Sequence, residues 1–233
     1  DANAGDDVVA QVALARPHDV VYVHDVLAED GGATWPVAGT IDFERVAVAG
    51  HSFGAYTALV VAGGTSEASV AAAACDAGDP SDIFCPYVAY WPPDELIGVT
   101  PPAGLRAAVS LAPGGASAFG GTGLQHVVVP TLVLGGTRDE TTPLDIEVRR
   151  IYDELPAPKA RGEIAGATHF GFTDICAIEG MGEALPELCG DPEALAHDQV
   201  FRITNHLTVA WLRWYLLDDV RALPHLGPEG AAA

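Results

Sequence analysis

A serine stands between two closely spaced glycines at the junction of two apolar segments. The stretch RVAVAGHSFGAYTALVVAG runs from a short β-branched segment through GHSFG, residues 50–54, into a small-residue apolar segment. A sharp strand-to-helix turn requires glycines here because side chains two residues either way would collide. Such a turn lifts the hydroxyl of Ser52 into solvent and aims the backbone N–H of Phe53 at a developing oxyanion. We predict Ser52 as a nucleophile; the alternative is a glycine-rich turn that happens to contain serine.

A serine hydroxyl needs a base to remove its proton, and the base needs a carboxylate to orient it. Downstream, TLVLGG leads into TRDETTP and places Asp139 just past a strand end, with Glu140 as the neighbouring alternative. Farther on, GATHFGFTD places His169 in a glycine-bounded loop. We predict Asp139 as the acid and His169 as the base; the alternatives are a solvated loop carboxylate and an ordinary loop histidine.

Alternating strands and helices are expected to position these residues. Four segments read as buried strands ending at glycine or proline: RVAVAG, LRAAVSLAP, HVVVPTLVLGG and a weaker ARGEIAG. Helical segments lie between and around them: residues 55–61, TTPLDIEVRRIYDELP, DQVFRITNHLTVAWLRWYLLDD and, near the start, RPHDVVYVHDVLAED. In the last of these, Val20, Val23 and Leu27 have helical spacing. The pattern predicts an α/β fold with a mostly parallel sheet flanked by helices.

Three ranges describe the expected domain organisation. Residues 1–223 are expected to belong to one domain, and residues 224–233 to form a flexible tail. Residues 75–102, rich in proline, aspartate and aromatic side chains, are expected to cross over the end of the sheet that carries the site. GGATWPVAGTID, which contains Trp35, reads as a loop before the nucleophile strand.

Charge and hydropathy exclude some partners. The 233 residues include 32 acidic and only 11 basic side chains, for a formal charge of −21 at pH 7. Such a surface repels nucleic acid and anionic membranes, so we predict no nucleic-acid partner. No apolar run approaches the roughly 18 to 20 residues that cross a bilayer, so we predict no transmembrane segment.

Four cysteines fall as two local pairs. Cys75 with Cys85 and Cys176 with Cys189 are each separated by loop-like sequence, which predicts two disulfides and an oxidising compartment. The chain would then be secreted, periplasmic or at the cell surface; the alternative is four buried free thiols. The histidines are scattered and no metal-ligand spacing occurs, so we predict neither a metal nor a cofactor.

The motifs GHSFGAYTAL, GGTRDETTP and GATHFGFTD, in this order, resemble the α/β-hydrolase superfamily, in particular bacterial proteins near the dienelactone hydrolases and the platelet-activating-factor acetylhydrolases. The resemblance spans about residues 16–218. Dienelactone hydrolases proper carry cysteine as the nucleophile, whereas Ser52 points to carboxylic ester hydrolysis. The resemblance implies that Ser52 attacks an ester carbonyl, that His169 passes the proton to the leaving alcohol, and that water cleaves the acyl-enzyme.

The sequence departs from this superfamily before the nucleophile. Its members usually place further strands and an oxyanion loop there, but residues 1–51 contain no convincing strand. We therefore expect the chain to be the C-terminal part of a hydrolase domain that lacks its N-terminal strands. An N-terminal fragment of the same hydrolase would then complete the sheet, cover the edge of the nucleophile strand and supply the second oxyanion donor.

Aromatic residues suggest where substrate binds. We assign the pocket to His51, Tyr87, Tyr90, Trp91 and Phe170; the alternative for the aromatics of residues 75–102 is that they pack this segment onto the domain, and His51 is expected to point into packing. With no basic patch, the favoured substrate is an uncharged small-molecule or polymeric ester with a short to medium acyl chain. A phospholipid-type ester hydrolysed by a lipase or acetylhydrolase is the second hypothesis, and a non-catalytic hydrolase-like binding module the third.

Overall fold

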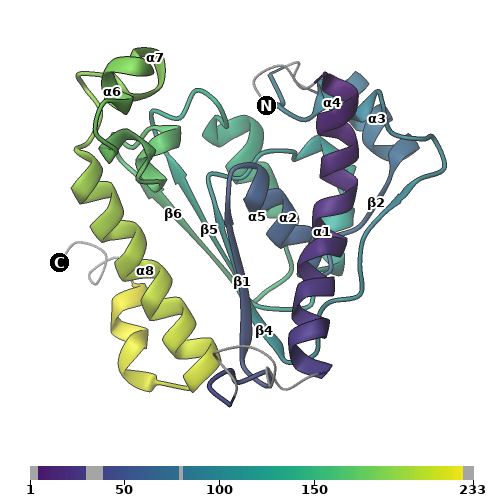
Figure 1. The fold of residues 1–233 in the computed structure, drawn as a ribbon, viewed down its shortest axis with the longest axis horizontal. Helices are drawn as coiled ribbons and strands as arrows, with labels where there is room; N and C mark the ends of the chain where they lie inside the picture. Colours follow the sequence, from purple (N-terminus) through teal and green to yellow (C-terminus); the bar gives the residue numbers. More distant parts are fainter. Residues whose placement is uncertain (1–4, 30–38, 79–80, 228–233) are drawn as a thin grey trace.

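A parallel sheet organises the computed structural model, which describes residues 5–29, 39–78 and 81–227. Within this part of the chain, the main sheet has four parallel strands in the order β1-β4-β5-β6, and β2 and β3 form a separate antiparallel pair (Figure 1). The strands are β1 (Val46–His51), β2 (Ser66–Glu67), β3 (Leu96–Ile97), β4 (Leu105–Leu111), β5 (Thr131–Gly136) and β6 (Lys159–Ile164).

Helices follow or connect these strands. The α-helices are α1 (Asp6–Glu29), α2 (Phe53–Val61), α3 (Ala68–Ala77), α4 (Cys85–Val88), α5 (Arg149–Glu154), α6 (Met181–Ala184), α7 (Pro186–Cys189) and α8 (His197–Leu217). The 3-10 helices are η1 (Ser117–Phe119), η2 (Gly123–His126), η4 (His169–Phe172), η5 (Ile175–Ala177) and η6 (Val220–Leu226), and η3 (Leu144–Val148) is a π-helical turn leading into α5.

The predicted strands are the strands of the main sheet. All run parallel, so their carboxyl ends meet at one edge, where the loops after β1, β5 and β6 carry the three predicted site residues. The register joins β1 to β4 along its length, from Val46 opposite Leu105 to His51 opposite Leu111. The apolar composition of β4 and β5 follows from burial on both faces of the sheet.

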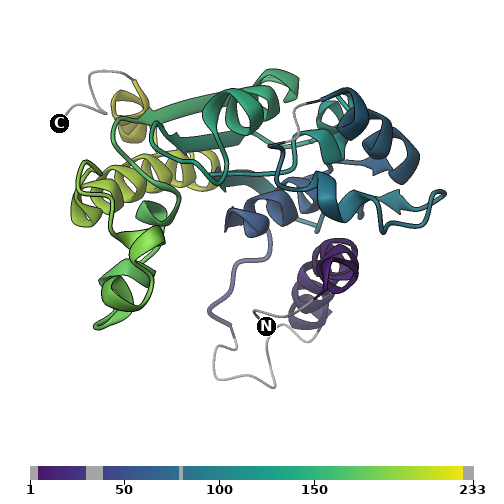
Figure 2. The same cartoon turned by 90° about the horizontal axis from the view of Figure 1, so that it is seen from above.

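Helices cover both faces of the sheet, so that the fold has three layers with the sheet in the middle (Figures 1 and 2). Side chains alternate along each strand, so successive residues enter different cores. Ala108 and Val133 pack in the core under α1, α2 and α5, whereas Val109 and Leu134 pack in the core under α8. Helix α2, which begins directly after Ser52, packs against β1 and β4 on one face of the sheet.

The first helix differs from the prediction in its extent and in its buried face. It begins at Asp6, and its buried residues are Ala10, Ala13 and Pro17. Val20 and Val23, part of the predicted apolar stripe, are 40% and 55% exposed. Small side chains bring the helix close to α2, and this close approach determines which face is buried.

Residues 75–102 leave the main sheet and return to it through α4 and β3. A disulfide joins Cys75 to Cys85, with Cα atoms 5.4 Å apart, and a second joins Cys176 to Cys189. Both predicted pairs are therefore present. Among the described helices, none combines the length and apolar composition needed to cross a membrane.

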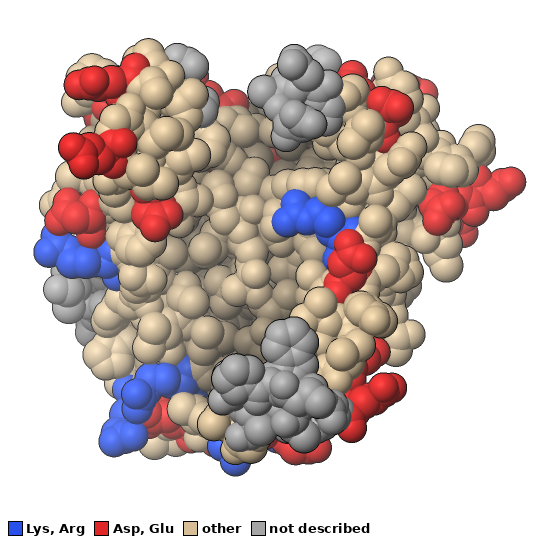
Figure 3. All heavy atoms as spheres, in the orientation of Figure 1, with Lys and Arg blue, Asp and Glu red and all other residues tan. Residues whose placement is uncertain are grey.

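Strand β1 lies at an end of the sheet order, with β4 as its neighbour in the described chain. Although its sequence is nearly all apolar, its side chains are half-buried and Ala49 is exposed. Figure 3 shows a hollowed, largely uncharged area between α1 and α8 on this side of the molecule. Within the described residues, the unpaired edge of β1 is thus bordered by surface that carries few charged side chains.

Two predicted irregular segments fall partly outside the described residues. Trp35 and most of its loop lie outside them, as do residues 228–233 of the expected tail. Pro224, expected in the tail, belongs instead to η6, which packs against α8.

Candidate active site

Ser52 occupies a strained turn between β1 and α2. Its backbone angles are φ 56° and ψ −120°, a conformation that residues with a Cβ rarely adopt. The turn is held in place because the backbone N–H of Ser52 donates to the carbonyl of Leu111, 2.9 Å away, at the end of β4. The sequence prediction of a sharp strand-to-helix turn at this serine is confirmed.

Of the two glycines that flank Ser52, only Gly50 is required because a side chain would not fit. A Cβ added to Gly50 would lie 2.0 Å from the carbonyl oxygen of Gly54, so no larger residue fits at position 50 without moving the backbone. A Cβ added to Gly54 would meet only Arg16 Nη2, at 3.9 Å. The expectation that side chains would collide on both sides is therefore wrong for Gly54, since the added Cβ would make only an ordinary van der Waals contact with a flexible side chain.

The three predicted residues meet at the carboxyl edge of the sheet. His169 Nε2 lies 2.8 Å from Ser52 Oγ, and His169 Nδ1 lies 2.8 Å from Asp139 Oδ2. The side chains of His169 and Asp139 are 5% and 0% exposed. The loops after β1, β5 and β6 thus converge into one hydrogen-bonded chain of hydroxyl, imidazole and carboxylate.

Asp139 is held by hydrogen bonds from its own loop. Its Oδ1 accepts the backbone N–H groups of Thr141 and Thr142 at 2.9 and 2.8 Å, and its Oδ2 accepts the Thr142 hydroxyl at 2.9 Å. These donors fix the orientation of the carboxylate. Glu140, the alternative acid, is exposed, and it is Asp139 that lies within hydrogen-bond distance of His169 Nδ1.

Sequence reasoning missed the role of Thr142. Besides Asp139, its buried hydroxyl lies 3.2 Å from the carbonyl of Ala112 and 3.2 Å from His169 Nδ1. The signal was present in TRDETTP, because an aspartate followed by hydroxyl residues commonly accepts N–H bonds from its own turn. Thr142 therefore joins the loop that follows β4 to the Asp139 loop.

His51 supports the loop that carries His169. Its Nε2–H donates to the carbonyl oxygen of His169 at 2.9 Å, and its ring stacks on Phe172 with centroids 6.2 Å apart. Burial, followed by the nearby His169, lowers the pKa of His51 to about 4. The ring is thus neutral near pH 7 and acts as a hydrogen-bond donor rather than as a second base. The expectation that His51 points into packing agrees with this placement.

The amide of Phe53 begins helix α2 beside the serine hydroxyl. The first N–H groups of a helix have no intrahelical acceptor, and the helix dipole adds positive potential there. The ring of Phe53 is anchored, with Phe84 at 5.4 Å and Tyr56 at 6.1 Å between centroids and the Arg16 guanidinium 4.6 Å from its centroid. The N–H of Phe53 is therefore the first donor of α2, directly after Ser52.

The predicted pocket residues are divided between the site and the core. Phe170 belongs to a polar cavity of about 330 Å³ beside His169, and this cavity is lined by Arg138, Glu140, Thr141, Thr168, His169, Phe170 and Asp191. Trp91 is only 5% exposed, and its indole N–H donates to the carbonyl of Ala10 on α1. Its assignment to the pocket is wrong, because it packs residues 75–102 onto the domain.

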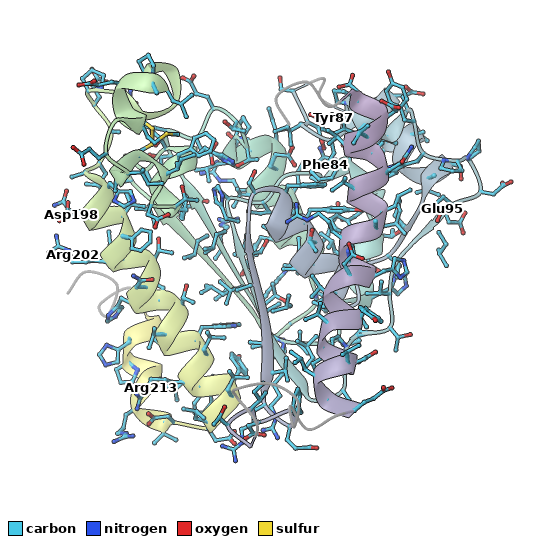
Figure 4. All side chains as sticks on the ribbon, viewed as in Figure 1. Phe84, Tyr87, Glu95, Asp198, Arg202 and Arg213 are labelled. Atoms are coloured by element: carbon cyan, nitrogen blue, oxygen red, sulfur yellow. A yellow bond between two sulfur atoms is a disulfide. The ribbon has the colours of Figure 1, made fainter. Side chains whose placement is uncertain are left out.

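The two tyrosines of the same segment also contribute to packing or face solvent. Tyr87 packs edge-on against Phe84 at 6.2 Å, and Tyr90 is 55% exposed. Figure 4 shows Phe84 and Tyr87 near the upper end of α1, on the opposite side of the molecule from Asp198 and Arg202 of α8. The alternative reading, in which these aromatics pack the segment onto the domain, therefore accounts for Trp91 and Tyr87.

The described residues contain no group of three or more histidine, cysteine or acidic side chains that could hold a metal ion. No protein-family model matches the chain, and a search of curated proteins finds no match.

Proposed function

We propose that this protein is a serine hydrolase that resembles the α/β-hydrolase superfamily and cleaves carboxylic esters through an acyl-enzyme. The observation that carries the proposal is the hydrogen-bonded chain in which His169 lies 2.8 Å from both Ser52 Oγ and Asp139 Oδ2. A nucleophile, a base and an orienting carboxylate in this order are what acyl transfer by serine requires. The strained turn at Ser52 supports the same role.

In the proposed reaction, Ser52, His169 and Asp139 act both in the formation of the acyl-enzyme and in its hydrolysis. His169 Nε2 takes the proton of Ser52 as its oxygen attacks the ester carbonyl, and then delivers that proton to the departing alcohol oxygen. Asp139 keeps Nδ1 protonated and stabilises the imidazolium. Water then enters, loses a proton to His169 and attacks the acyl carbon, and Ser52 Oγ recovers a proton as it leaves.

The N–H of Phe53 is the proposed donor to the tetrahedral oxyanion. It is fixed by the start of α2 and by the packing of the Phe53 ring, so its orientation does not have to change during the reaction. A preorganised donor of this kind contributes about 3 to 4 kcal/mol to transition-state stabilisation.

The cavity beside His169 supports an uncharged substrate. Its single arginine, Arg138, is already engaged by Asp191 at 2.7 Å and by Glu193 at 3.1 Å. Among the described residues of the lining, no lysine or arginine is therefore left to bind a phosphate or carboxylate. A short to medium-chain ester or a polyester is the proposed substrate class.

The free edge of β1 supports a further part of the proposal. A nearly all-apolar strand at an edge exposes unpaired N–H and C=O groups that another strand can bind. We assign this edge to an N-terminal fragment of the same hydrolase, which also provides the second oxyanion donor. The two disulfides support a secreted, periplasmic or cell-surface location.

Covalent labelling with a fluorophosphonate tests the proposed activity. The expected result is one adduct per chain, mapped to Ser52 by peptide mass spectrometry, and no adduct in Ser52→Ala. Ser69→Ala, which removes an exposed hydroxyl on α3, is the matched control and keeps full labelling. A folded wild-type protein that takes up no label is an inert binding module, and the proposal then fails.

Substrate class is tested on the unlabelled protein, because the adduct blocks Ser52. A series of p-nitrophenyl esters of increasing acyl length, a lysophospholipid and a polyester film separate the remaining hypotheses. Higher kcat/KM on short p-nitrophenyl esters or release of monomers from the film supports the proposal. A preference for the lysophospholipid supports the phospholipid-type alternative.

A further inference from the structure

A buried carboxyl group lies on the segment that carries the proposed catalytic acid. Glu147 belongs to η3, which follows the Asp139 loop, and its side chain is 0% exposed. Burying a carboxyl group is costly unless hydrogen bonds compensate for the lost water. Glu147 takes no part in the proposed proton transfers, so its contacts must explain its burial.

Glu147 accepts hydrogen bonds from two other segments of the chain. Its Oε1 accepts the N–H of Ile83 at 3.0 Å, and its Oε2 accepts the N–H of Ala116 at 2.8 Å. The N–H of Gly115 also bonds to this carboxyl group. One side chain therefore joins η3 both to residues 75–102 and to the loop after β4.

A second buried carboxylate joins the same two segments. Asp82 is 1% exposed; its Oδ1 accepts the N–H of Phe84 at 3.0 Å, and its Oδ2 accepts the N–H of Ser117 at 2.7 Å. Consecutive N–H groups at the start of η1 are thus divided between the two carboxyl groups. Such a cluster of N–H groups favours negative charge.

Each connected segment contacts the site directly. The loop after β4 begins at Ala112, whose carbonyl lies 3.2 Å from the Thr142 hydroxyl that orients Asp139. From residues 75–102, the ring of Phe84 lies 5.4 Å from the ring of Phe53, which carries the proposed oxyanion donor. A shift of either segment would therefore displace the acid or the donor.

We propose that Glu147 is a positioning residue that holds the Asp139 loop and the Phe53 amide in register by joining η3, the loop after β4 and residues 75–102. This inference rests on the proposed esterase function and deepens it. Asp82 acts in the same assembly by fixing the start of η1. Neither carboxyl group touches the substrate or the reacting atoms.

The ionisation of Glu147 gives this role a measurable signature. Burial, followed by the negative charge of Asp82, raises the pKa of Glu147 to about 8, while its three backbone donors act in the opposite direction. Asp82 is the charged group facing it from residues 75–102, and Arg150 of α5 lies 3.4 Å from Ser117 Oγ on the neighbouring side of η1. The ionised carboxylate can accept hydrogen bonds from all three N–H groups. The neutral acid carries a hydroxyl proton, which has no acceptor among these N–H donors. Positioning is therefore strongest above the pKa.

The experiment measures the second-order rate constant of fluorophosphonate labelling at Ser52 from pH 6 to 9.5, together with kcat and KM on a short p-nitrophenyl ester. Wild type is expected to show a rise with an apparent pKa near 8. Glu147→Gln is expected to lose this rise and about 10 to 100-fold in labelling rate and kcat, with KM little changed, because small displacements of reacting groups cost this much. Glu154→Gln, a half-buried acid on the adjoining helix, is the matched control and keeps the wild-type profile.

Asp82→Asn provides a second, independent arm. Removing its negative charge lowers the pKa of Glu147, so the rise in labelling rate moves to lower pH. This arm and the wild-type profile decide the question if Glu147→Gln does not fold, as judged by circular dichroism. A wild-type profile that lacks the rise, or a folded Glu147→Gln protein with the wild-type rate and profile, overturns the inference. Labelling of Ser52 in the same samples keeps the proposed function standing in that case, whereas wild-type protein without label overturns both.

Discussion

The imidazole of His51 donates a hydrogen bond to the backbone carbonyl of His169, with Nε2 and O 2.9 Å apart. The residue before the proposed nucleophile thus anchors the loop that carries the proposed base. Because this bond joins the ends of β1 and β6 across the carboxyl edge of the sheet, it limits how far Ser52 Oγ and His169 Nε2 can separate.

Replacing the proposed acid should abolish most activity while leaving the fold intact. Asp139→Asn is expected to lower kcat about 1,000 to 10,000-fold, because an amide cannot stabilise the imidazolium and favours the wrong tautomer of His169. Steady-state kinetics on a p-nitrophenyl ester measures the effect. Asp153→Asn, at an exposed acid on α5, is the control and should keep kcat within about threefold; a comparable loss in both variants would show that Asp139 has no special role.

The hydroxyl of Thr142 should contribute to catalysis without touching substrate. Thr142→Val preserves side-chain shape and removes the hydrogen bond to Asp139 Oδ2. Losing a bond to a charged group, worth about 1.5 kcal/mol, should lower kcat about tenfold with little change in KM. Thr142→Ser, which keeps the hydroxyl, should recover most of kcat; unchanged kcat in the valine variant would contradict this role.

The two glycines around Ser52 should respond differently to alanine. Gly50→Ala places a Cβ 2.0 Å from the carbonyl of Gly54 and is expected to destabilise the protein by about 3 kcal/mol or more. Gly54→Ala adds a Cβ within α2 that meets only the end of the Arg16 side chain, 3.9 Å away, so the stability of this variant should be retained. Urea denaturation followed by fluorescence measures both, and equal losses would contradict the one-sided crowding.

Stability should fall between pH 6.5 and 8 because of Glu147. Its pKa is raised from 4.5 to about 8 in the folded protein, so its contribution is complete below 4.5 and is lost as pH rises through 8. His51 has the opposite sign: its pKa is lowered from 6.5 to about 4, so its contribution is present above 6.5 and lost as pH falls through 4. Above pH 6.5, Glu147 rather than His51 therefore determines how the free energy of unfolding changes with pH. The slope is up to about 1.4 kcal/mol per pH unit.

Urea denaturation at pH 6.5, 7.25 and 8 measures this slope. Glu147→Gln should have a flatter profile than wild type over this range, whereas Glu154→Gln should keep the wild-type slope. If Glu147→Gln and wild type lose stability in parallel, the slope belongs to other groups.

The sequence predicted the strands, the sharp turn at Ser52 and the positions of Asp139 and His169, because each depends on local pattern. An all-apolar run of about six residues predicts a strand buried on both faces, and parallel strands place the residues that follow them at one edge. The pairing of Cys75 with Cys85 was accessible for the same reason, since the two residues are close in the chain. The α1 face was predicted incorrectly because spacing does not reveal which stripe meets α2, and small alanines allowed the closer contact.

By itself, the sequence determined which residues could form a nucleophile, base and acid, and in which order they occur, since these follow from residue type and from the strand and turn patterns beside them. Only the tertiary structure decided that Asp139 rather than Glu140 meets His169, that Trp91 binds Ala10 in the core, and that Glu147 joins three distant segments. These contacts connect residues about 30 or more positions apart, and the packing of the loops at the carboxyl edge, rather than any local pattern, determines which polar groups find partners there.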